Sequence, residues 1–340
     1  MDAGNGSGWN LLQELAGHTE AVLGLAVSHN GKHVFSASAD RTVRMWRVGL
    51  GRGYLLQGFF GLADRVNDVC FVNTHSRREG GNLIVAASHD RTARAYAIEE
   101  ARSIRVLSGH TDQVNSVSVC PGSFVVTASN DTTVRVWNPS DPTGKCVKVI
   151  EGHTDAVTCV CITAPEASAV YVISASQDKS VRLWDLNNGF ASAGQLGPHP
   201  DSVLSVCTSF REVFVNGKLD SYVVTGSQDG LVRVWLLSSR QLCYKLRHLG
   251  VTCVALSRDS SRIATGSRDR TACIWNISDG KVHKTLSGEH NGPVNSVCFT
   301  PDGTHVLTAS QDSTAIVWLV IHGVPVRKLT NGHTYVPVSL

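Results

Sequence analysis

Residues 129–137 read Ser-Asn-Asp-Thr-Thr-Val-Arg-Val-Trp, and within them an aspartate is followed six residues later by an aromatic residue. This spacing occurs seven times, and successive aspartates lie 50, 41, 47, 51, 40 and 43 residues apart. Such a period is typical of a four-stranded blade and not of a two-helix repeat. The seven pairs are Asp40 with Trp46, Asp90 with Tyr96, Asp131 with Trp137, Asp178 with Trp184, Asp229 with Trp235, Asp269 with Trp275 and Asp312 with Trp318.

Each repeat also carries the pattern of four short strands. Its opening segment, such as 113–119, has apolar anchors three residues apart with small flanking residues, which suits an inner strand near a central axis. A turn such as Asp302-Gly303 and a second strand follow. In the third strand, polar and apolar residues alternate, as in 133–137. We therefore predict an all-β fold, a seven-bladed β-propeller of four-stranded antiparallel blades over residues 9–329, with a flexible N-terminal tail at 1–8 and a C-terminal tail at 330–340.

The composition is that of a chain with many buried strands. Charged residues make up 17% of the chain, against about 25% in typical globular proteins, and 42% of residues are hydrophobic. Lysine and arginine are spread through the repeats and the formal net charge is only +3, which does not favour a dedicated nucleic-acid binder. The first eight residues lack the features of a secretory signal, and no apolar run approaches roughly 18 residues. We expect no membrane insertion and a cytoplasmic protein, with the nucleus as the alternative.

The ten cysteines do not indicate a disulfide framework, because such frameworks belong to short secreted chains. Six of them stand in the small-residue positions of the inner strands, and we expect free thiols. Four share one repeated position and are predicted to react with thiol reagents only after unfolding: Cys70, Cys161, Cys207 and Cys298.

The chain resembles the WD-repeat family, whose propellers include the β subunit of heterotrimeric G proteins. The resemblance rests on Gly-His pairs such as Gly109-His110 and on Ser-x-Asp-x-Thr-(x3)-Trp strings, although only Trp184-Asp185 keeps the Trp-Asp dipeptide. It implies that His, Ser or Thr, Asp and Trp form a buried hydrogen-bond network in each blade. The implied network residues are His18, Asp40, Trp46, Asp90, His110, Asp131, Trp137, His153, Asp178, Trp184, His199, Asp229, Trp235, Asp269, Trp275, His290, Asp312 and Trp318.

Two blades depart from this pattern. Blade two has Leu62 where His is expected and Tyr96 where Trp is expected. In blade six, His248 lies three residues before its valine instead of four. We interpret both departures as divergence of a tolerant blade.

A set such as His18, Ser36 and Asp40 has the residue types of a nucleophilic triad. Similar sets recur in other blades, however, whereas one active site needs one activated nucleophile. Cys159-Val160-Cys161 has the wrong spacing for a zinc site. We therefore predict no catalytic residues, no metal site and no cofactor.

The face that carries the aspartate turns, here called the top face, is the expected binding surface. An acidic or phosphorylated segment is the hypothesised ligand, because arginine offers bidentate, charge-assisted hydrogen bonds. Long connections place a rival surface on the opposite face, here called the bottom face. The predicted top-face binding residues are His89, Asn130, Gln177, Gln228, Arg268, Arg270 and Gln311.

These observations favour a non-catalytic scaffold or adaptor, either a monomer or a subunit of a larger hetero-complex, that binds segments or domains of other proteins. The alternative is a ribonucleoprotein or chromatin component that contacts nucleic acid through basic loops such as Arg77-Arg78.

Two segments compete for the outer strand of the last blade, Leu11 to Leu15 and Pro325 to Leu329, and each precedes a Gly-His pair. We favour the N-terminal segment, because joining both chain ends in one blade would close the ring, and expect Pro325 to Leu329 outside the ring or in a tail.

Overall fold

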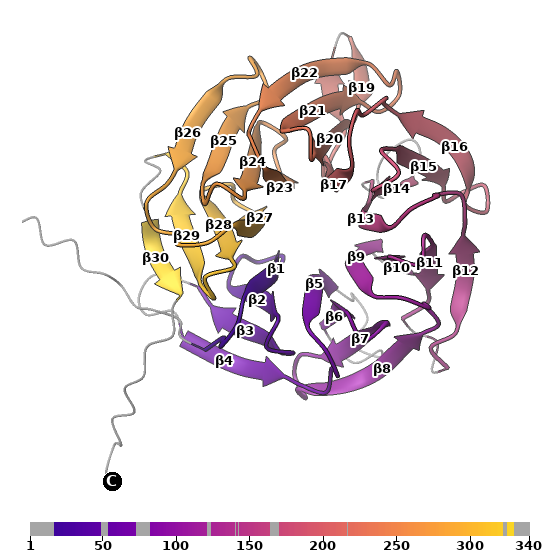
Figure 1. The fold of residues 1–340 in the computed structure, drawn as a ribbon, viewed down its shortest axis with the longest axis vertical. Helices are drawn as coiled ribbons and strands as arrows, with labels where there is room; N and C mark the ends of the chain where they lie inside the picture. Colours follow the sequence, from indigo (N-terminus) through magenta and orange to yellow (C-terminus); the bar gives the residue numbers. More distant parts are fainter. Residues whose placement is uncertain are drawn as a thin grey trace, which may run out of the picture.

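The computed structural model describes residues 17–48, 54–72, 82–120, 124–139, 141, 143–163, 170–215, 217–321 and 325–329. Seven four-stranded antiparallel sheets form a ring, and in each the first strand lies nearest the axis and the fourth at the rim (Figure 1). The prediction of a seven-bladed propeller is confirmed. No helix long enough and apolar enough to cross a membrane occurs in the described part of the chain.

The blades follow one another in sequence order. Blade one comprises β1 (Val22–Val27), β2 (His33–Ser38), β3 (Val43–Arg47) and β4 (Tyr54–Phe59), and blade two comprises β5 (Val66–Val72), β6 (Leu83–Ser88), β7 (Thr92–Ala97) and β8 (Arg102–Ser108). Blade three comprises β9 (Val114–Cys120), β10 (Phe124–Ser129), β11 (Val134–Trp137) and β12 (Cys146–Ile150), and blade four comprises β13 (Val157–Ile162), β14 (Tyr171–Ser176), β15 (Val181–Asp185) and β16 (Ala191–Leu196). Blade five comprises β17 (Val203–Thr208), β20 (Tyr222–Ser227), β21 (Leu231–Leu236) and β22 (Leu242–Arg247). Blade six comprises β23 (Val251–Leu256), β24 (Arg262–Ser267), β25 (Ala272–Asn276) and β26 (Val282–Leu286). Blade seven comprises β27 (Val294–Phe299), β28 (His305–Ser310), β29 (Ala315–Leu319) and β30 (Pro325–Leu329).

Blade five carries an additional two-stranded sheet in the connection between β17 and β20. It consists of β18 (Val213–Val215) and β19 (Lys218–Asp220).

The second strand of every blade is buried on both faces, because neighbouring sheets cover it. In β10, for example, every residue after Phe124 is buried. The fourth strands lie at the rim and are more exposed, as in β26, where Val282, Lys284 and Thr285 are exposed. This gradient explains why second strands are uncharged runs of small and β-branched residues after their first position, whereas fourth strands tolerate charge.

Side-chain hydrogen bonds join the inner strands of adjacent blades. Asn115 in β9 donates from Nδ2 to the carbonyl of Val157 in β13 at 2.8 Å, and Asn295 in β27 donates to the carbonyl of Val22 in β1 at 3.0 Å, so the bond also joins the last blade to the first. In blades two, four and six the equivalent donors are Asn67, Thr158 and Thr252. Leucine replaces the donor in blades one and five, at Leu23 and Leu204.

The predicted closure of the last blade is wrong. Pro325–Leu329 forms β30, which pairs with β29 as the fourth strand of blade seven, with Val317 opposite Arg327. Only residues 320–324 separate β29 from β30, so this hairpin closes a short loop, whereas pairing with residues 11–15 would close a loop of about three hundred residues at a higher entropic cost. Residues 11–15 and both predicted tails lie outside the described residues.

All nine cysteines whose side chains are described are free thiols, as predicted. Burial raises the pKa of Cys298 to about 12, and it raises the pKa values of Cys70, Cys161 and Cys207 as well. Because the thiolate is the reactive form, we expect the folded protein to label slowly at these four positions at pH 7 and quickly in denaturant. Mass-spectrometric mapping of a thiol reagent would check this, and fast labelling of the four in the folded protein would contradict it.

Candidate protein-binding face

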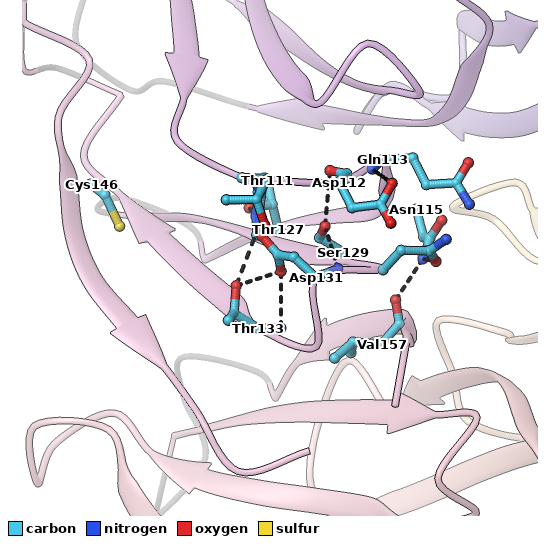
Figure 2. A network of polar contacts seen from close by, with 12 residues as sticks. Thr111, Asp112, Gln113, Asn115, Thr127, Ser129, Asp131, Thr133, Cys146 and Val157 are labelled. Carbon is cyan, nitrogen blue, oxygen red and sulfur yellow. Dashed lines mark hydrogen bonds and ion pairs between the residues drawn. The ribbon is translucent and has the colours of Figure 1, made fainter. Parts of the chain in front are cut away.

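Blade three shows the hydrogen-bond network that supports the aspartate turns (Figure 2). His110 Nδ1 lies 2.7 Å from Asp131 Oδ2, and its Nε2 lies 2.8 Å from the Thr127 hydroxyl. Trp137 donates from Nε1 to the same hydroxyl at 2.8 Å. Asp131 Oδ1 accepts the amide and hydroxyl of Thr133 at 3.0 and 2.7 Å. One histidine therefore links the turn to the second strand, and one tryptophan links the second strand to the third.

The same arrangement occurs in blades one, four and seven. The distances from His Nδ1 to Asp Oδ2 are 2.7 Å for His18 and Asp40, 2.8 Å for His153 and Asp178, and 3.2 Å for His290 and Asp312. Trp46, Trp184 and Trp318 donate to the hydroxyls of Ser36, Ser174 and Thr308 respectively.

The networks hold their carboxylates ionised. Burial alone would raise the pKa of Asp40, but the hydrogen bond and charge of His18, with the Thr42 hydroxyl and the Thr19 amide, lower it to about 2. Burial opposed by Ser180 and His153 likewise leaves the pKa of Asp178 at about 2. These aspartates therefore act as anionic acceptors that organise the turns.

The histidine, serine and aspartate of blade one have the connectivity of a catalytic triad, but the serine is not available as a nucleophile. Ser36 is 1% exposed, and its Oγ accepts the indole N–H of Trp46 at 2.7 Å. A substrate carbonyl has no access to this oxygen, so the arrangement suits a structural role and not acyl transfer.

Blade five has a different network. Asp229 pairs with Arg233, with Nη2 to Oδ2 at 2.6 Å. His199 Nε2 lies 3.0 Å from the Thr225 hydroxyl, while its Nδ1 is buried without a hydrogen-bond partner among the described residues. The cause is Leu231, which replaces the hydroxyl residue that holds the aspartate in blade three. The buried Arg233 takes over that role. The predicted pairing of His199 with Asp229 is therefore not formed.

Blades two and six also differ. His248 bonds the hydroxyls of Thr265 and Thr271, and its Nε2 lies 3.8 Å from Asp269, outside hydrogen-bond distance. In blade two, Leu62 and Tyr96 are buried, and Asp90 still accepts the amide and hydroxyl of Thr92. Blade two thus replaces the histidine and tryptophan by apolar packing.

A half-buried carboxylate in the inner strand of blade two, Asp68, lies outside these networks. Asp68 in β5 accepts the Ser116 hydroxyl at 2.9 Å and the Val117 amide at 3.0 Å, both from blade three. Burial nevertheless raises the pKa of Asp68 from its ordinary value of 3.8 to about 6, despite these bonds and that of the Val69 amide.

The raised pKa of Asp68 predicts a pH effect of defined sign. The folded state binds a proton below about pH 6, whereas the unfolded state binds it only near pH 4, so this residue's contribution to stability grows as pH falls through that window. The free energy of unfolding of wild type, minus that of Asp68→Asn, should rise by about 2 kcal/mol between pH 7 and pH 4. Urea titrations at both values would measure it, and a constant difference would contradict the assignment.

The predicted binding residues occupy equivalent positions on the top face. Except for Arg270, each directly follows a second strand and donates its backbone N–H to a carbonyl just before or at the start of the first strand, as Arg268 does to Gly250 at 2.9 Å. Five side chains are exposed and two are half-buried. The exposed ones are Gln177, Gln228, Arg268, Arg270 and Gln311, and the half-buried ones are His89 and Asn130.

Two of these residues have partners that the sequence did not indicate. His89 Nδ1 lies 2.8 Å from Asp64 Oδ2, and Asn130 accepts a hydrogen bond from Asn115 at 2.8 Å. Both side chains are therefore already engaged within the fold. Leu249, which sequence reasoning did not select, is 60% exposed on the same face.

The family model for the WD domain, G-beta repeat, matches residues 9–47, 101–138, 144–185, 192–235, 240–276 and 280–318. The interval 48–100 between the first two matches holds most of blade two, the blade with Leu62 and Tyr96. The matched segments cover more than half of the chain.

Three curated relatives illustrate the similarity. WD repeat-containing protein 37 of Mus musculus is 33% identical over 58% of this chain, which covers 39% of that protein. Autophagy-related protein 16 of Arabidopsis thaliana is 25% identical over 79% of this chain and 50% of its own length. Nuclear distribution protein PAC1 of Arthroderma otae is 26% identical over 81% of this chain and 63% of its own length. The chain thus spans less than two thirds of the length of each of these relatives. Its matched repeats and its seven blades show that it belongs to the WD repeat family of β-propellers.

Proposed function

We infer that the chain is a non-catalytic scaffold or adaptor that binds acidic or phosphorylated segments of other proteins on its top face. Propellers of this family generally bind other proteins. The observation that carries the proposal is the exposure of Arg268 and Arg270, whose guanidinium groups make no hydrogen bond or ion pair with any described residue. Two such cations on one turn, one on either side of Asp269 in the sequence, suit a carboxylate or phosphate.

The local charge supports an acidic ligand. Blades one to five carry an acid in the turn before the first strand, whereas blade six has Gly250 there, preceded by the exposed Leu249. Between the two arginines, Asp269 is already engaged as acceptor of the Thr271 amide and hydroxyl. Blade six therefore offers two cations and one apolar side chain. The acids of blades one to five are Glu20, Asp64, Asp112, Asp155 and Asp201, and blade seven, like blade six, has a glycine there, Gly292.

The charge-reversed variant Arg268→Glu with Arg270→Glu tests this site. We expect it to fold normally, because both side chains are exposed, and to lose partners that the wild-type chain captures from cell extract. Quantitative mass spectrometry of the captured proteins would measure the loss. The matched control is Arg41→Glu with Arg91→Glu, which makes the same charge change at exposed turn positions of blades one and two. Equal loss in both variants would contradict a specific role for blade six.

Nucleic-acid binding remains the second candidate from the sequence, but its basic loop at Arg77-Arg78 lies outside the described residues. The salt dependence of binding separates the two functions. Neutralising several phosphates gives a steep dependence on salt, whereas one acidic segment gives a shallow one.

A further inference from the structure

The connection from blade five to blade six presents an apolar side chain on the top face. Leu249 lies between β22, the outer strand of blade five, and β23, the inner strand of blade six, and it is 60% exposed. In blades one, three and four a threonine stands at this position and an acid follows it, whereas Gly250 follows Leu249. The top face is therefore locally apolar where those three blades are polar and acidic. The threonines are Thr19, Thr111 and Thr154.

A glycine in the neighbouring turn makes room for Leu249. The residue after the turn aspartate has a positive φ in every blade, and in the other six blades it is Arg41, Arg91, Thr132, Lys179, Arg270 or Ser313. In blade five it is Gly230, which is buried. A Cβ atom at Gly230 would lie 3.3 Å from Leu249 Cδ2, so a side chain there would press on the leucine. The sequence of the blade-five turn thus permits the place that Leu249 takes.

Hydrogen bonds hold this connection to both blades. The His248 N–H donates to the carbonyl of Gly230 in blade five at 3.0 Å. The Leu249 carbonyl accepts the Ser267 hydroxyl of blade six at 2.6 Å, and the Arg268 N–H donates to the Gly250 carbonyl at 2.9 Å. A surface held in this way loses little conformational entropy when a ligand binds.

Arginines flank Leu249 on both sides. On the rim side, Arg247 ends β22 opposite Leu231, is exposed, and makes no side-chain hydrogen bond or ion pair with any described residue. On the axis side, Gly250 lies against Arg268, because a Cβ atom at Gly250 would lie 3.3 Å from Arg268 Cβ. A path along residues 247–250 from the rim towards the axis therefore passes a cation, an apolar side chain and a second cation (Figure 1).

The acids beside this path do not cancel its positive charge. Asp269 stands between Arg268 and Arg270 in the sequence, and Asp229 pairs with Arg233 at 2.6 Å. Both aspartates count as full negative charges at pH 7. With Arg247 included, four arginines stand against two aspartates, which leaves a net charge of +2 along the path. This balance favours an acidic ligand.

The next acids on the top face limit the direction of the ligand. Asp201 stands on the connection from blade four to blade five, and Glu289 and Asp312 stand on the side of blade seven. A segment that followed the ring from blade to blade would meet these like charges, whereas a segment along residues 247–250 would not. The charges therefore favour a segment that runs between the rim and the axis.

We propose that the acidic segment bound by Arg268 and Arg270 lies along residues 247–250, with an apolar side chain against Leu249 and acidic residues on both sides of it, the outer one at Arg247. This inference rests on the proposed function of the top face. It adds the sequence pattern that the face recognises, which is an apolar residue between acidic residues. Leu249 selects the apolar residue, and Arg247 is a further binding residue.

The probe is a short fluorescein-labelled peptide with one leucine between glutamates, compared with the same peptide carrying serine for leucine. In fluorescence anisotropy at low salt, the wild-type chain should bind the leucine peptide at least about fivefold more tightly. Leu249→Thr should bind both peptides alike, and it should fold because blades one, three and four have threonine there. The matched control is Leu219→Thr, which should keep the wild-type preference, since Leu219 is 62% exposed but lies opposite Phe214 in the β18–β19 hairpin.

The role of Arg247 has its own variant. Arg247→Gln should weaken binding of both peptides at least about threefold at low salt and keep the preference for leucine, because it removes a charge and leaves Leu249 in place. Arg41→Gln removes an exposed arginine from the top face of blade one and should bind like wild type.

The results separate this inference from the proposed function. If neither peptide binds, or if Arg268→Glu with Arg270→Glu binds both as tightly as wild type, the proposed function is wrong and the inference with it. If both peptides bind through these arginines but wild type does not prefer leucine, Leu249→Thr keeps the preference, or Arg247→Gln binds like wild type, the inference alone is overturned. Tighter binding of a single-stranded oligonucleotide of equal charge at the same arginines would assign the site to nucleic acid and overturn both.

Discussion

Replacing Asp131 by alanine is expected to lower the free energy of unfolding by about 3 kcal/mol. Its carboxylate lies 2.7 Å from His110 and accepts the Thr111 amide and the amide and hydroxyl of Thr133. The side chain is only 4% exposed, so water cannot fully replace these bonds when it is removed. Urea denaturation of the wild-type and variant chains would measure the difference.

Asp269→Ala is the matched control within the same chain. The Asp269 side chain is 46% exposed and lies 3.8 Å from His248, which bonds two threonine hydroxyls instead. We therefore expect a loss of only about 1 kcal/mol, from the bonds to Thr271. Equal losses for the two variants would show that the histidine network contributes nothing beyond the turn itself.

Truncation before β30 is expected to have the largest effect on stability. Removal of residues 325–340 leaves the edge of β29 unpaired and exposes a blade that packs against blade one around the Trp46 indole. We expect a loss of roughly 5 kcal/mol or more, comparable with the whole stability of many domains. Thermal and urea unfolding would measure it.

Removal of residues 330–340 alone is the control for that truncation, because it keeps β30 intact. We expect the shorter truncation to change stability by less than about 1 kcal/mol. If instead both truncated chains unfold like the wild-type chain, β30 does not supply the fourth strand of blade seven.

The fold could be predicted from the sequence because its signal is repeated. Each aspartate turn is closed by short-range bonds, such as those from Asp131 to Thr133, and the aromatic residue six positions later sits on the next strand. Because the aspartate turn and its aromatic residue occur seven times, the departure of a single blade from the pattern does not change the predicted fold. The outer strand of blade seven has no such repeated signal, because residues 11–15 and 325–329 match the same pattern and only chain connectivity separates them.

The site was predictable in its outline but not in its pairings. Leu231 in place of a hydroxyl residue was a signal that Asp229 would need another partner, yet the burial of Arg233 depends on packing that no local pattern encodes. The hydrogen bonds between inner strands could also have been expected, because a polar residue such as Asn67 or Asn115 recurs at the same position of these strands and a buried polar group needs a partner. The exposed Phe214 and Leu219 lie in strands of three residues, too short for a periodicity to be read.

The measurement that tests the central claim most directly is the affinity of the chain for an acidic segment of a captured partner, at low and at physiological salt. The proposed site predicts that Arg268→Glu with Arg270→Glu binds at least about tenfold more weakly than wild type at low salt, and that the difference narrows as salt screens the charges. It also predicts that Arg41→Glu with Arg91→Glu binds like wild type. Equal affinity of wild type and the blade-six variant at low salt would contradict the claim that the top face binds acidic segments through blade six.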